Sequence, residues 1–303
     1  MTIDIEILQF LHYHPLANRA KIMAGLMEAP SDSTMKRLLS AAAKEGNVET
    51  VGRGPATKYR LTPQAHVTMP LDLATYFDKD IDERVVQESF NFDLIREVLP
   101  KVEIFTKEEL EVLNAAQKEF KKNTEGMTDL EYRKEMERLG VDLSWKSSQI
   151  EGNTYSLLET ERLLKDKQTA SGKTKEEAIM LLNHKDALDF VLDVPDYLKE
   201  LSVHRIEDIH SILTKELEVD RNIRHRRVGI TGTNYRPLDN EFQIREALED
   251  TCTLVNGKDN VFEKALLTLV LLSYIQAFVD GNKRTARYGR LLPQISSVLR
   301  KTA

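Results

Sequence analysis

One stretch near the C-terminal end concentrates residue types that bind phosphate: Gln276-Ala277-Phe278-Val279-Asp280-Gly281-Asn282-Lys283-Arg284-Thr285-Ala286-Arg287. A Gly-Asn turn before a helix leaves backbone N–H groups free, and three basic side chains follow it at helical spacing. Asp280 supplies a carboxylate that can hold Mg²⁺ between phosphate oxygens. The residues alone predict an anion site with a metal ligand. The alternative is an ordinary helix start, capped by Asp280, with solvated basic side chains.

Two helices must position this loop. The apolar run from Ala265 to Ile275 contains only Thr268 and Ser273 as polar interruptions. It is too short to span a bilayer and indicates a buried helix before the loop. A second helix is expected to run from the loop towards Leu292, where Pro293 follows.

The stretch resembles the signature of the Fic family, His-x-Phe-x-Asp/Glu-Gly-Asn-Gly/Lys-Arg-x-x-Arg. The matching positions are Phe278, Asp280, Gly281, Asn282, Lys283, Arg284 and Arg287. Family members usually transfer AMP from ATP to a protein hydroxyl, on an all-helical domain with a small β-hairpin flap. The resemblance covers about residues 80 to 300. It implies ATP and Mg²⁺ as cofactors and a protein acceptor of unknown identity, for which this chain itself is one candidate.

The resemblance also implies roles for single residues. Asp280 would bind Mg²⁺, and Phe278 would pack in the core. Gly281 and Asn282 would form the anion hole. The phosphates would be held by the basic residues Lys283, Arg284 and Arg287, with Asn282 and Arg284 counted among the catalytic groups.

Residues 226–237 interrupt the helical pattern of the C-terminal half. Val228 and Ile230 favour a strand and Gly232 permits a tight turn, so we expect a short hairpin here. By resemblance this hairpin is the flap, which lays an extended target segment beside the nucleotide. Gly232 and Thr233 would then contact the nucleotide.

A second element, Ser147-Ser148-Gln149-Ile150-Glu151-Gly152-Asn153, is similar to the family's inhibitory-helix motif, Ser/Thr-x-x-x-Glu-Gly/Asn. It implies an inhibitory helix at about residues 141–152, carried by Ser147, Glu151 and Gly152. An ion pair between Glu151 and Arg287 would occupy an arginine that the γ-phosphate of ATP needs. The alternative is a helix that ends at Gly152 with an exposed glutamate.

The sequence departs from the signature at Gln276, which stands where the family has histidine. Histidine suits the role of general base because its pKa lies near neutrality. A glutamine cannot take the proton, although its carbonyl can orient a hydroxyl. We expect the contribution of that base, typically about 10² to 10⁴-fold, to be lost while nucleotide binding survives. We expect ordinary surface or core roles for the remaining candidates, His184, His204, His210 and His225.

Residues 1–68 predict a separate domain. Helices are expected near residues 5–11, 17–27 and 34–44, followed by two short strands around a Gly-Arg-Gly turn. This order resembles a winged helix-turn-helix domain. The resemblance implies DNA binding through Lys36, Arg37, Arg53, Lys58 and Arg60. The alternative is a protein-docking domain with a solvated basic face.

The charge distribution and the cysteine content limit which classes of protein this chain can belong to. The 303 residues carry a net charge of -6, yet the first 70 hold eight basic and six acidic side chains. A local basic patch favours a local interaction surface. The opening Met1-Thr2-Ile3-Asp4 lacks the pattern of a signal peptide, and the single Cys252 suits a reducing compartment. We therefore expect a cytoplasmic protein with no membrane contact and no zinc site.

Together these features predict a mainly α protein. It would consist of a winged-helix (α+β) domain at 1–68, a helical connector at 69–100 and an all-helical Fic domain with a hairpin flap at 101–303. Two functions remain open, with a homodimer compatible with both. One is slow AMP transfer, released when Glu151 is displaced. The other is a non-catalytic, nucleotide-responsive regulator that binds DNA.

Overall fold

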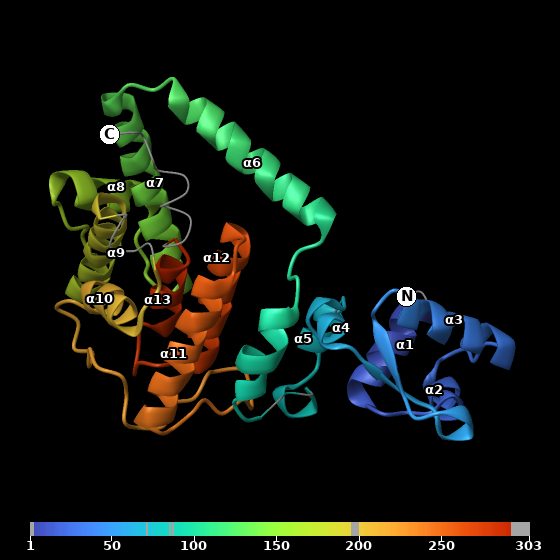
Figure 1. Ribbon diagram of the computed structural model, residues 1–303. Helices are drawn as coiled ribbons and strands as arrows, with labels where there is room; N and C mark the ends of the chain where they lie inside the picture. Colours follow the sequence, from blue (N-terminus) through green and yellow to red (C-terminus); the bar gives the residue numbers. More distant parts are fainter. Residues whose placement is uncertain (1–2, 71, 85, 87, 195–199, 292–303) are drawn as a thin grey trace. The chain divides into compact units, whose positions relative to one another are not determined.

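A computed structural model describes the chain except residues 1–2, 71, 85, 87, 195–199 and 292–303 (Figure 1). The described residues are mainly helical, as the sequence predicts. They divide into two compact units. The N-terminal unit comprises Met1–Val85 and Asp93–Thr106, and the C-terminal unit comprises Val86–Phe92 and Lys107–Ala303.

The N-terminal unit combines helices with one antiparallel strand pair. In chain order it contains α1 (Ile3–Tyr13), α2 (Arg19–Gly25), α3 (Asp32–Lys44), β1 (Val48–Val51), β2 (Lys58–Leu61), α4 (Pro63–Thr68) and α5 (Leu73–Asp78). Short helical turns occupy Gly54–Ala56, Ile81–Glu83, Leu94–Val98 and Leu99–Lys101. The expected order of three helices and two strands is present.

A single apolar core holds this unit together. Its buried members are Ile7, Leu11, Ala17, Ile22, Met35, Leu39, Val48, Leu61, Ala65 and Met69. The strands pair with Val48 opposite Leu61, so both of these side chains face the core. The Tyr59 amide donates to the Ala17 carbonyl at 2.8 Å and ties β2 to the segment between α1 and α2.

Residues 69–100 are the stretch that the sequence predicts to be a helical connector. Most of them cluster with the N-terminal unit. The Gln64 side chain explains part of this, because it pairs twice with the backbone of Glu103. Its Nε2 donates to the Glu103 carbonyl at 2.6 Å, and its Oε1 accepts from the Glu103 amide at 3.0 Å.

The C-terminal unit is helical. Its helices are α6 (Lys107–Glu125), α7 (Asp129–Ile150), α8 (Leu157–Asp166), α9 (Lys175–Asp193), α10 (Val203–Leu213), α11 (Glu241–Gly257), α12 (Val261–Ile275) and α13 (Asn282–Gly289). The end predicted for the last helix, at Leu292 and Pro293, lies outside the described residues. None of the helices in the described part is long and apolar enough to cross a membrane.

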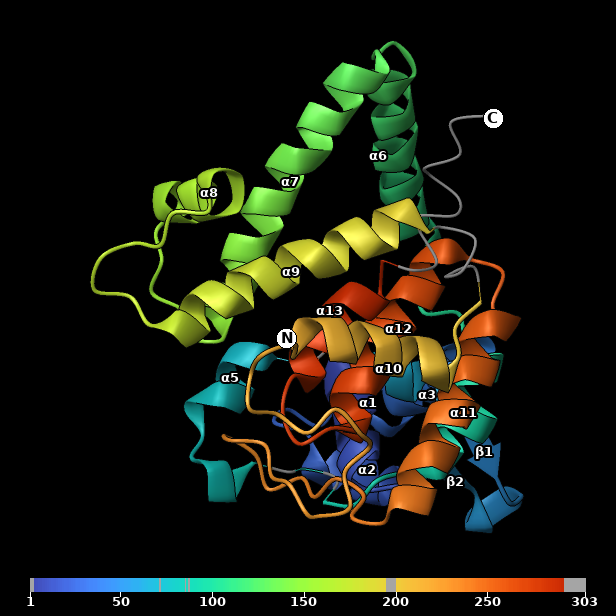
Figure 2. The same cartoon turned by 90° about the vertical axis from the view of Figure 1, so that its left-hand side faces the viewer.

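Helix packing in this unit brings the motif loop against several elements. Helix α12 packs on α11 and α13, α10 packs on α9 and α13, and α7 packs on α8 and α9. Figure 2 shows α6 and α7 diverging from a short connection, with α9 beside α7. Helices α7, α8 and α9 each begin with a capping box, in which a Ser or Thr and a Glu three residues later satisfy the first backbone amides.

The hairpin predicted at residues 226–237 is not formed as two strands. This segment has a turn at Gly232, where φ is +87°, and a single parallel bridge between Arg236 and Ser89. The segment lacks the hydrogen-bond ladder of a hairpin, and the buried side chain of Arg224 bonds to its backbone instead. Its guanidinium donates to the carbonyls of Arg226, at 2.8 Å, and of Leu238. The small antiparallel sheet of the structure is β1–β2 instead.

Candidate active site

The loop between α12 and α13 starts with a left-handed residue. Gln276 follows the last helical residue, Ile275, and has φ 54° and ψ 56°. A residue with a side chain adopts this conformation at a cost of about 1 to 3 kcal/mol, so surrounding contacts must hold it. Arg224 supplies one, since its Nε donates to the Gln276 carbonyl at 2.6 Å.

The Gln276 side chain is turned back onto its own helix. Its amide nitrogen donates to the Ser273 carbonyl at 2.7 Å, and the residue is only 8% exposed. A carbonyl only accepts hydrogen bonds, so this contact fixes which end of the amide is the nitrogen. The Oε1 atom accepts no hydrogen bond from any described residue. It is therefore the atom of Gln276 that can accept a hydrogen bond from a ligand.

Asn282 closes the loop on itself. Its Oδ1 accepts from the Phe278 amide at 2.8 Å, and its Nδ2 donates to the Phe278 carbonyl at 2.7 Å. The side chain predicted for the anion hole thus forms a two-bond clamp within the loop. Phe278 is 2% exposed, which agrees with the predicted core position.

His210 is a site residue that sequence reasoning missed. Its ring stacks on Phe278, with centroids 3.7 Å apart, and its Nε2 donates to the Asp280 carbonyl at 3.0 Å. Burial lowers the pKa of His210, so the ring is neutral at pH 7. The sequence holds no signal for this contact, because 70 residues separate the two partners.

Arg224 was missed for the same reason. It is fully buried and donates to the carbonyls of Gln276, of Arg226 at the start of the 226–237 segment, and of Leu238 just after it. In addition, its own amide donates to the Ala277 carbonyl at 3.1 Å. Among the several arginines near residue 225, no sequence pattern distinguishes the buried one.

Gly281 is the N-cap residue immediately before α13, and it has a backbone conformation that suits glycine. Its φ is +80°, and an added Cβ would lie 3.2 Å from the Thr214 methyl group and 3.3 Å from the His210 ring. No side chain caps the helix at this position. The first backbone amides of α13 are therefore available to an anion.

Asp280 and Arg284 form an ion pair beside this helix start. Asp280 Oδ1 accepts from the Gly281 amide at 2.6 Å, and Oδ2 accepts from Arg284 Nη2 at 2.8 Å. The Arg284 side chain is 3% exposed, whereas Asp280 is 60% exposed. Two buried nitrogens of Arg284, Nε and Nη1, have no hydrogen-bond partner in the described part of the chain. Buried donors without a partner cost about 1 to 3 kcal/mol each, so this guanidinium suits an anionic ligand.

The donor set suits Mg²⁺ bound together with phosphate. In the described part of the chain, no group of three or more His, Cys, Asp or Glu side chains could hold a metal alone. Mg²⁺ is typically bound by one or two carboxylates together with phosphate oxygens and water. The exposed carboxylate of Asp280 fits that pattern. The predicted phosphate ligand Lys283 is exposed next to it.

The C-terminal end of α7 contacts the last arginine of the motif. Arg287 Nη2 donates to Glu151 Oε1 at 2.5 Å, and its Nε donates to Ser147 Oγ at 2.9 Å. The expected ion pair is therefore present, with side chains 14% and 23% exposed. Glu151 caps the helix, and Gly152 follows with φ at +90°.

Contacts to the neighbouring segment fix this end of α7. Trp145 Nε1 donates to the Tyr155 carbonyl at 3.0 Å, and Asn153 Nδ2 donates to the Glu177 carbonyl at 2.8 Å. The Glu177 carboxylate accepts from the hydroxyl and amide of Thr154 and from the Thr174 amide, which lowers its pKa to about 2. The position of Glu151 is thus set by several bonds outside its own helix.

The remaining predicted site residues lie in the 226–237 segment and in the N-terminal unit. Gly232 forms the exposed turn of the 226–237 segment, and Thr233 Oγ1 accepts from the Tyr235 amide at 3.2 Å. In the N-terminal unit, all five basic residues predicted to bind DNA are exposed: Lys36, Arg37, Arg53, Lys58 and Arg60. Arg60 forms a cross-strand ion pair with Glu49.

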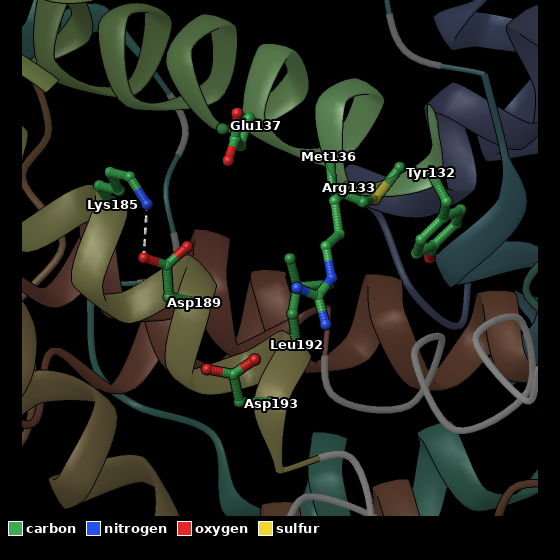
Figure 3. A pocket seen from close by; sticks show the side chains of 9 residues that line it. Tyr132, Arg133, Met136, Glu137, Lys185, Asp189, Leu192 and Asp193 are labelled. Carbon is green, nitrogen blue, oxygen red and sulfur yellow. Dashed lines mark hydrogen bonds and ion pairs between the residues drawn. The ribbon is translucent and has the colours of Figure 1, made fainter. Parts of the chain in front are cut away.

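A cavity of about 560 Å³ lies elsewhere, between α7 and α9 (Figure 3). Arg133 and Glu137 reach it from α7, and Lys185, Asp189 and Asp193 from α9. Lys185 Nζ bonds to Asp189 Oδ2 at 2.5 Å. Its lining contains no motif residue, and its mixed charges favour no anion.

Comparison with known proteins identifies the part of the chain that holds this loop. The Fic/DOC family model matches residues 200–289. A comparison with curated proteins finds no match. Among solved structures, a Fic domain containing signaling protein from Bacteroides thetaiotaomicron aligns with 60% of this chain and 72% of its own, at 17% identity and a TM-score of 0.53.

Two further structures are similar. A Fic family protein from Desulfovibrio desulfuricans aligns over 63% of this chain and 58% of its own, at 15% identity and a TM-score of 0.50. Fic-1 from C. elegans aligns over 63% and 60%, at 20% identity and a TM-score of 0.48. This chain thus spans less than two thirds of either relative. At these identities the likeness concerns the fold alone, whereas the match of residues 200–289 to the Fic/DOC family model covers the motif loop.

Proposed function

We propose that the loop at residues 276–287 binds the phosphates of ATP and supports AMP transfer to a protein hydroxyl only slowly. The observation that carries this proposal is the buried guanidinium of Arg284, with two nitrogens that have no partner among the described residues, beside the uncapped start of α13. Family membership of residues 200–289 supports the nucleotide and the reaction class. Asp280 would hold Mg²⁺, which neutralises phosphate charge when bound.

The reaction would be a displacement at the α-phosphorus. The acceptor hydroxyl oxygen forms a bond to that phosphorus, the bond to the bridging oxygen breaks, and pyrophosphate leaves with the electron pair. The hydroxyl proton passes to water, because the Gln276 amide cannot take it. Before the reaction, Gln276 Oε1 orients the hydroxyl by accepting its hydrogen bond, and the hydroxyl turns this hydrogen towards water as the new bond forms. Positioning and charge stabilisation remain, whereas general-base catalysis does not.

We further propose that Glu151 restrains nucleotide binding. Its ion pair with Arg287 at 2.5 Å uses a guanidinium that would otherwise serve a phosphate. Replacement of Glu151 by Gly should raise the affinity for ATP with Mg²⁺ by about tenfold, equivalent to about 1.4 kcal/mol, in isothermal titration calorimetry. The control is Gln149→Gly, which places a glycine in the same helix turn at an exposed position.

Intact-mass spectrometry after incubation with ATP and Mg²⁺ tests the transfer. Glu151→Gly should gain the mass of one AMP group slowly. The double variant with Gln276→His should gain it about 10² to 10⁴-fold faster, since it restores a base. Failure of every variant to bind ATP would contradict the proposal at its root. Binding without labelling in both variants would leave a nucleotide-binding protein without transfer.

The second candidate is a non-catalytic regulator that responds to nucleotide and binds DNA. Gln276 favours it, because its side chain is hydrogen-bonded to Ser273 and has no basic group that could take up the proton of a hydroxyl. The exposed basic side chains of the N-terminal unit also favour it. Nucleotide binding is common to both candidates, so the mass measurement on Glu151→Gly alone, which keeps Gln276, separates them.

A further inference from the structure

A short stretch of the chain lies as an added strand on the 226–237 segment. Residues 88–92 read Glu-Ser-Phe-Asn-Phe. They belong to the piece Val86–Phe92 that clusters with the C-terminal unit, although the chain on both sides of it clusters with the N-terminal unit. We name residues 88–92 the strap and residues 226–237 the flap.

The strap and the flap share backbone pairing. The Arg236 amide donates to the Glu88 carbonyl at 2.7 Å, and Ser89 forms a parallel bridge with Arg236. Between described residues, this is the β-bridge that the flap forms. The Arg236 guanidinium also lies 3.6 Å from the Glu88 carboxylate. The flap therefore obtains its β-pairing from the strap and not from a second strand of its own.

An aromatic contact anchors the strap next to the motif loop. The Phe90 ring stacks on Tyr274 with centroids 4.7 Å apart, and the Asn91 amide donates to the Tyr274 hydroxyl at 3.0 Å. Tyr274 also stacks on Tyr235 of the flap, at 4.8 Å, and its carbonyl accepts from the Tyr235 hydroxyl at 3.0 Å. Tyr274 lies two residues before Gln276, so this stack joins strap, flap and motif.

The arrangement has the features of peptide recognition by strand addition. Main-chain bonds supply affinity in this mode, and contacts to alternate side chains supply specificity. Glu88 and Phe90 are alternate residues, and they meet a guanidinium and an aromatic ring. An acidic residue followed two positions later by an aromatic one is therefore the pattern that this edge selects.

We propose that the strap is an internal ligand of the flap. It occupies the position that an extended segment of a target protein would take, and targets carry the same acidic-x-aromatic pattern. This inference rests on the proposed function, because a target protein exists only if the site transfers a group to one. The docking of the strap on the flap does not depend on nucleotide. A tethered ligand acts at an effective concentration of about millimolar, so a free target segment must compete with it.

A labelled peptide tests the competition in the full chain. The probe is a fluorescein-labelled peptide with the sequence of residues 86–93, measured by fluorescence anisotropy. Phe90→Ala should bind it at least about tenfold more tightly than the unaltered chain, because the internal competitor is weakened. Adding Tyr274→Ala should abolish the gain. Phe77→Ala removes an exposed phenylalanine in the N-terminal unit and should leave binding unchanged.

Hydrogen exchange supplies a readout at the pairing itself. The Arg236 amide should exchange faster in Phe90→Ala than in the unaltered chain, whereas the Arg224 amide, bonded to Ala277, should not change. Phe90→Leu, which retains an apolar side chain but loses the ring stack, gives the same test if the alanine variant is poorly folded.

The proposal would be overturned if Phe90→Ala and the unaltered chain bound the peptide with equal affinity and the Arg236 amide exchanged at the same rate in both. Both readouts are made without nucleotide, so the two proposals fail separately. Loss of ATP binding alone contradicts the proposed function and leaves strap docking intact. Normal ATP binding with no effect of Phe90→Ala contradicts the strap only.

Discussion

Buried polar side chains around α13 have hydrogen-bonding groups without a partner. Both ring nitrogens of His184, two nitrogens of Arg284 and the hydroxyls of Ser148 and Thr285 belong to this set. Native proteins contain few such groups because each costs free energy. Their concentration next to the motif loop indicates where a ligand or water completes the bonding, and it singles out Arg284 over the exposed Lys283.

His184 gives a test of stability against pH. Burial, with Arg284 and Arg287 nearby, lowers the pKa of His184 to about 3. The unfolded chain titrates near 6.5, so unfolding takes up a proton between these values. The free energy of unfolding should therefore fall as pH decreases below about 6.5. His184→Phe removes this contribution and should flatten the decrease, measured by urea denaturation at pH 7 and pH 5.

At pH 7 the same variant should change stability by less than about 1 kcal/mol, since the buried ring makes no hydrogen bond that would be lost. The control is His204→Phe, whose side chain is 78% exposed. An equally steep decrease in His184→Phe and in the unaltered chain would refute the assignment of a neutral buried ring.

At the scale of elements, the motif loop is fixed by contacts from outside its own helices. Arg224 precedes the flap, His210 comes from α10, and the end of α7 supplies Glu151. Each of these contacts is a bond to a backbone carbonyl or to a charged group, so small displacements of one element change the geometry of the loop. This explains how a glutamine is held in the left-handed region at Gln276.

Replacement of Arg224 tests this view. Arg224→Leu should destabilise the protein by about 3 kcal/mol, because three bonded carbonyls lose a buried charged donor. Arg224→Lys should also destabilise it, since an ammonium lacks the planar fork. Chemical denaturation measures both.

The matched control is Arg227→Leu. This side chain is 87% exposed and ion-paired with Asp239 at 2.7 Å, so its loss should cost less than about 1 kcal/mol. Equal effects at the two positions would contradict the role given to Arg224.

At the scale of the whole molecule, charge is distributed unevenly along the chain. The net charge is -6, whereas residues 1–70 have an excess of two basic side chains. The exposed basic residues of α3 and of the β1–β2 pair all belong to this stretch. An overall acidic protein can therefore carry a local anion-binding surface.

DNA binding by the N-terminal unit is a prediction of its own. Affinity for duplex DNA should fall steeply as salt concentration rises, and Lys36→Ala should reduce the salt slope by about one. Anisotropy of labelled DNA between 50 and 200 mM salt, roughly the range in which phosphate contacts are lost, measures both. Lys118→Ala in α6 is an exposed control. Salt-independent binding, or none, would favour the protein-docking alternative.

Much of the fold is predictable from local pattern. Helix α12 follows from its apolar run, α3 from the Ser31 cap and its amphipathic repeat, and β1 and β2 from short β-forming runs around glycines. The residues of the motif loop are contiguous, so their type and spacing alone indicate an anion site. Even the Glu151 and Arg287 pair is predictable, because both lie in recognisable motifs.

The tertiary structure decided the contacts that join distant segments. His210 and Arg224 reach the motif loop across 70 and 52 residues, and the strap reaches the flap across more than 140, without any periodic signal. It also replaced the expected hairpin at 226–237 by pairing with the strap. Sequence pattern reports which residues share a local face. Which buried donor meets which carbonyl depends on packing of whole elements, because long-range hydrogen bonds form only where the folded chain brings both partners out of water.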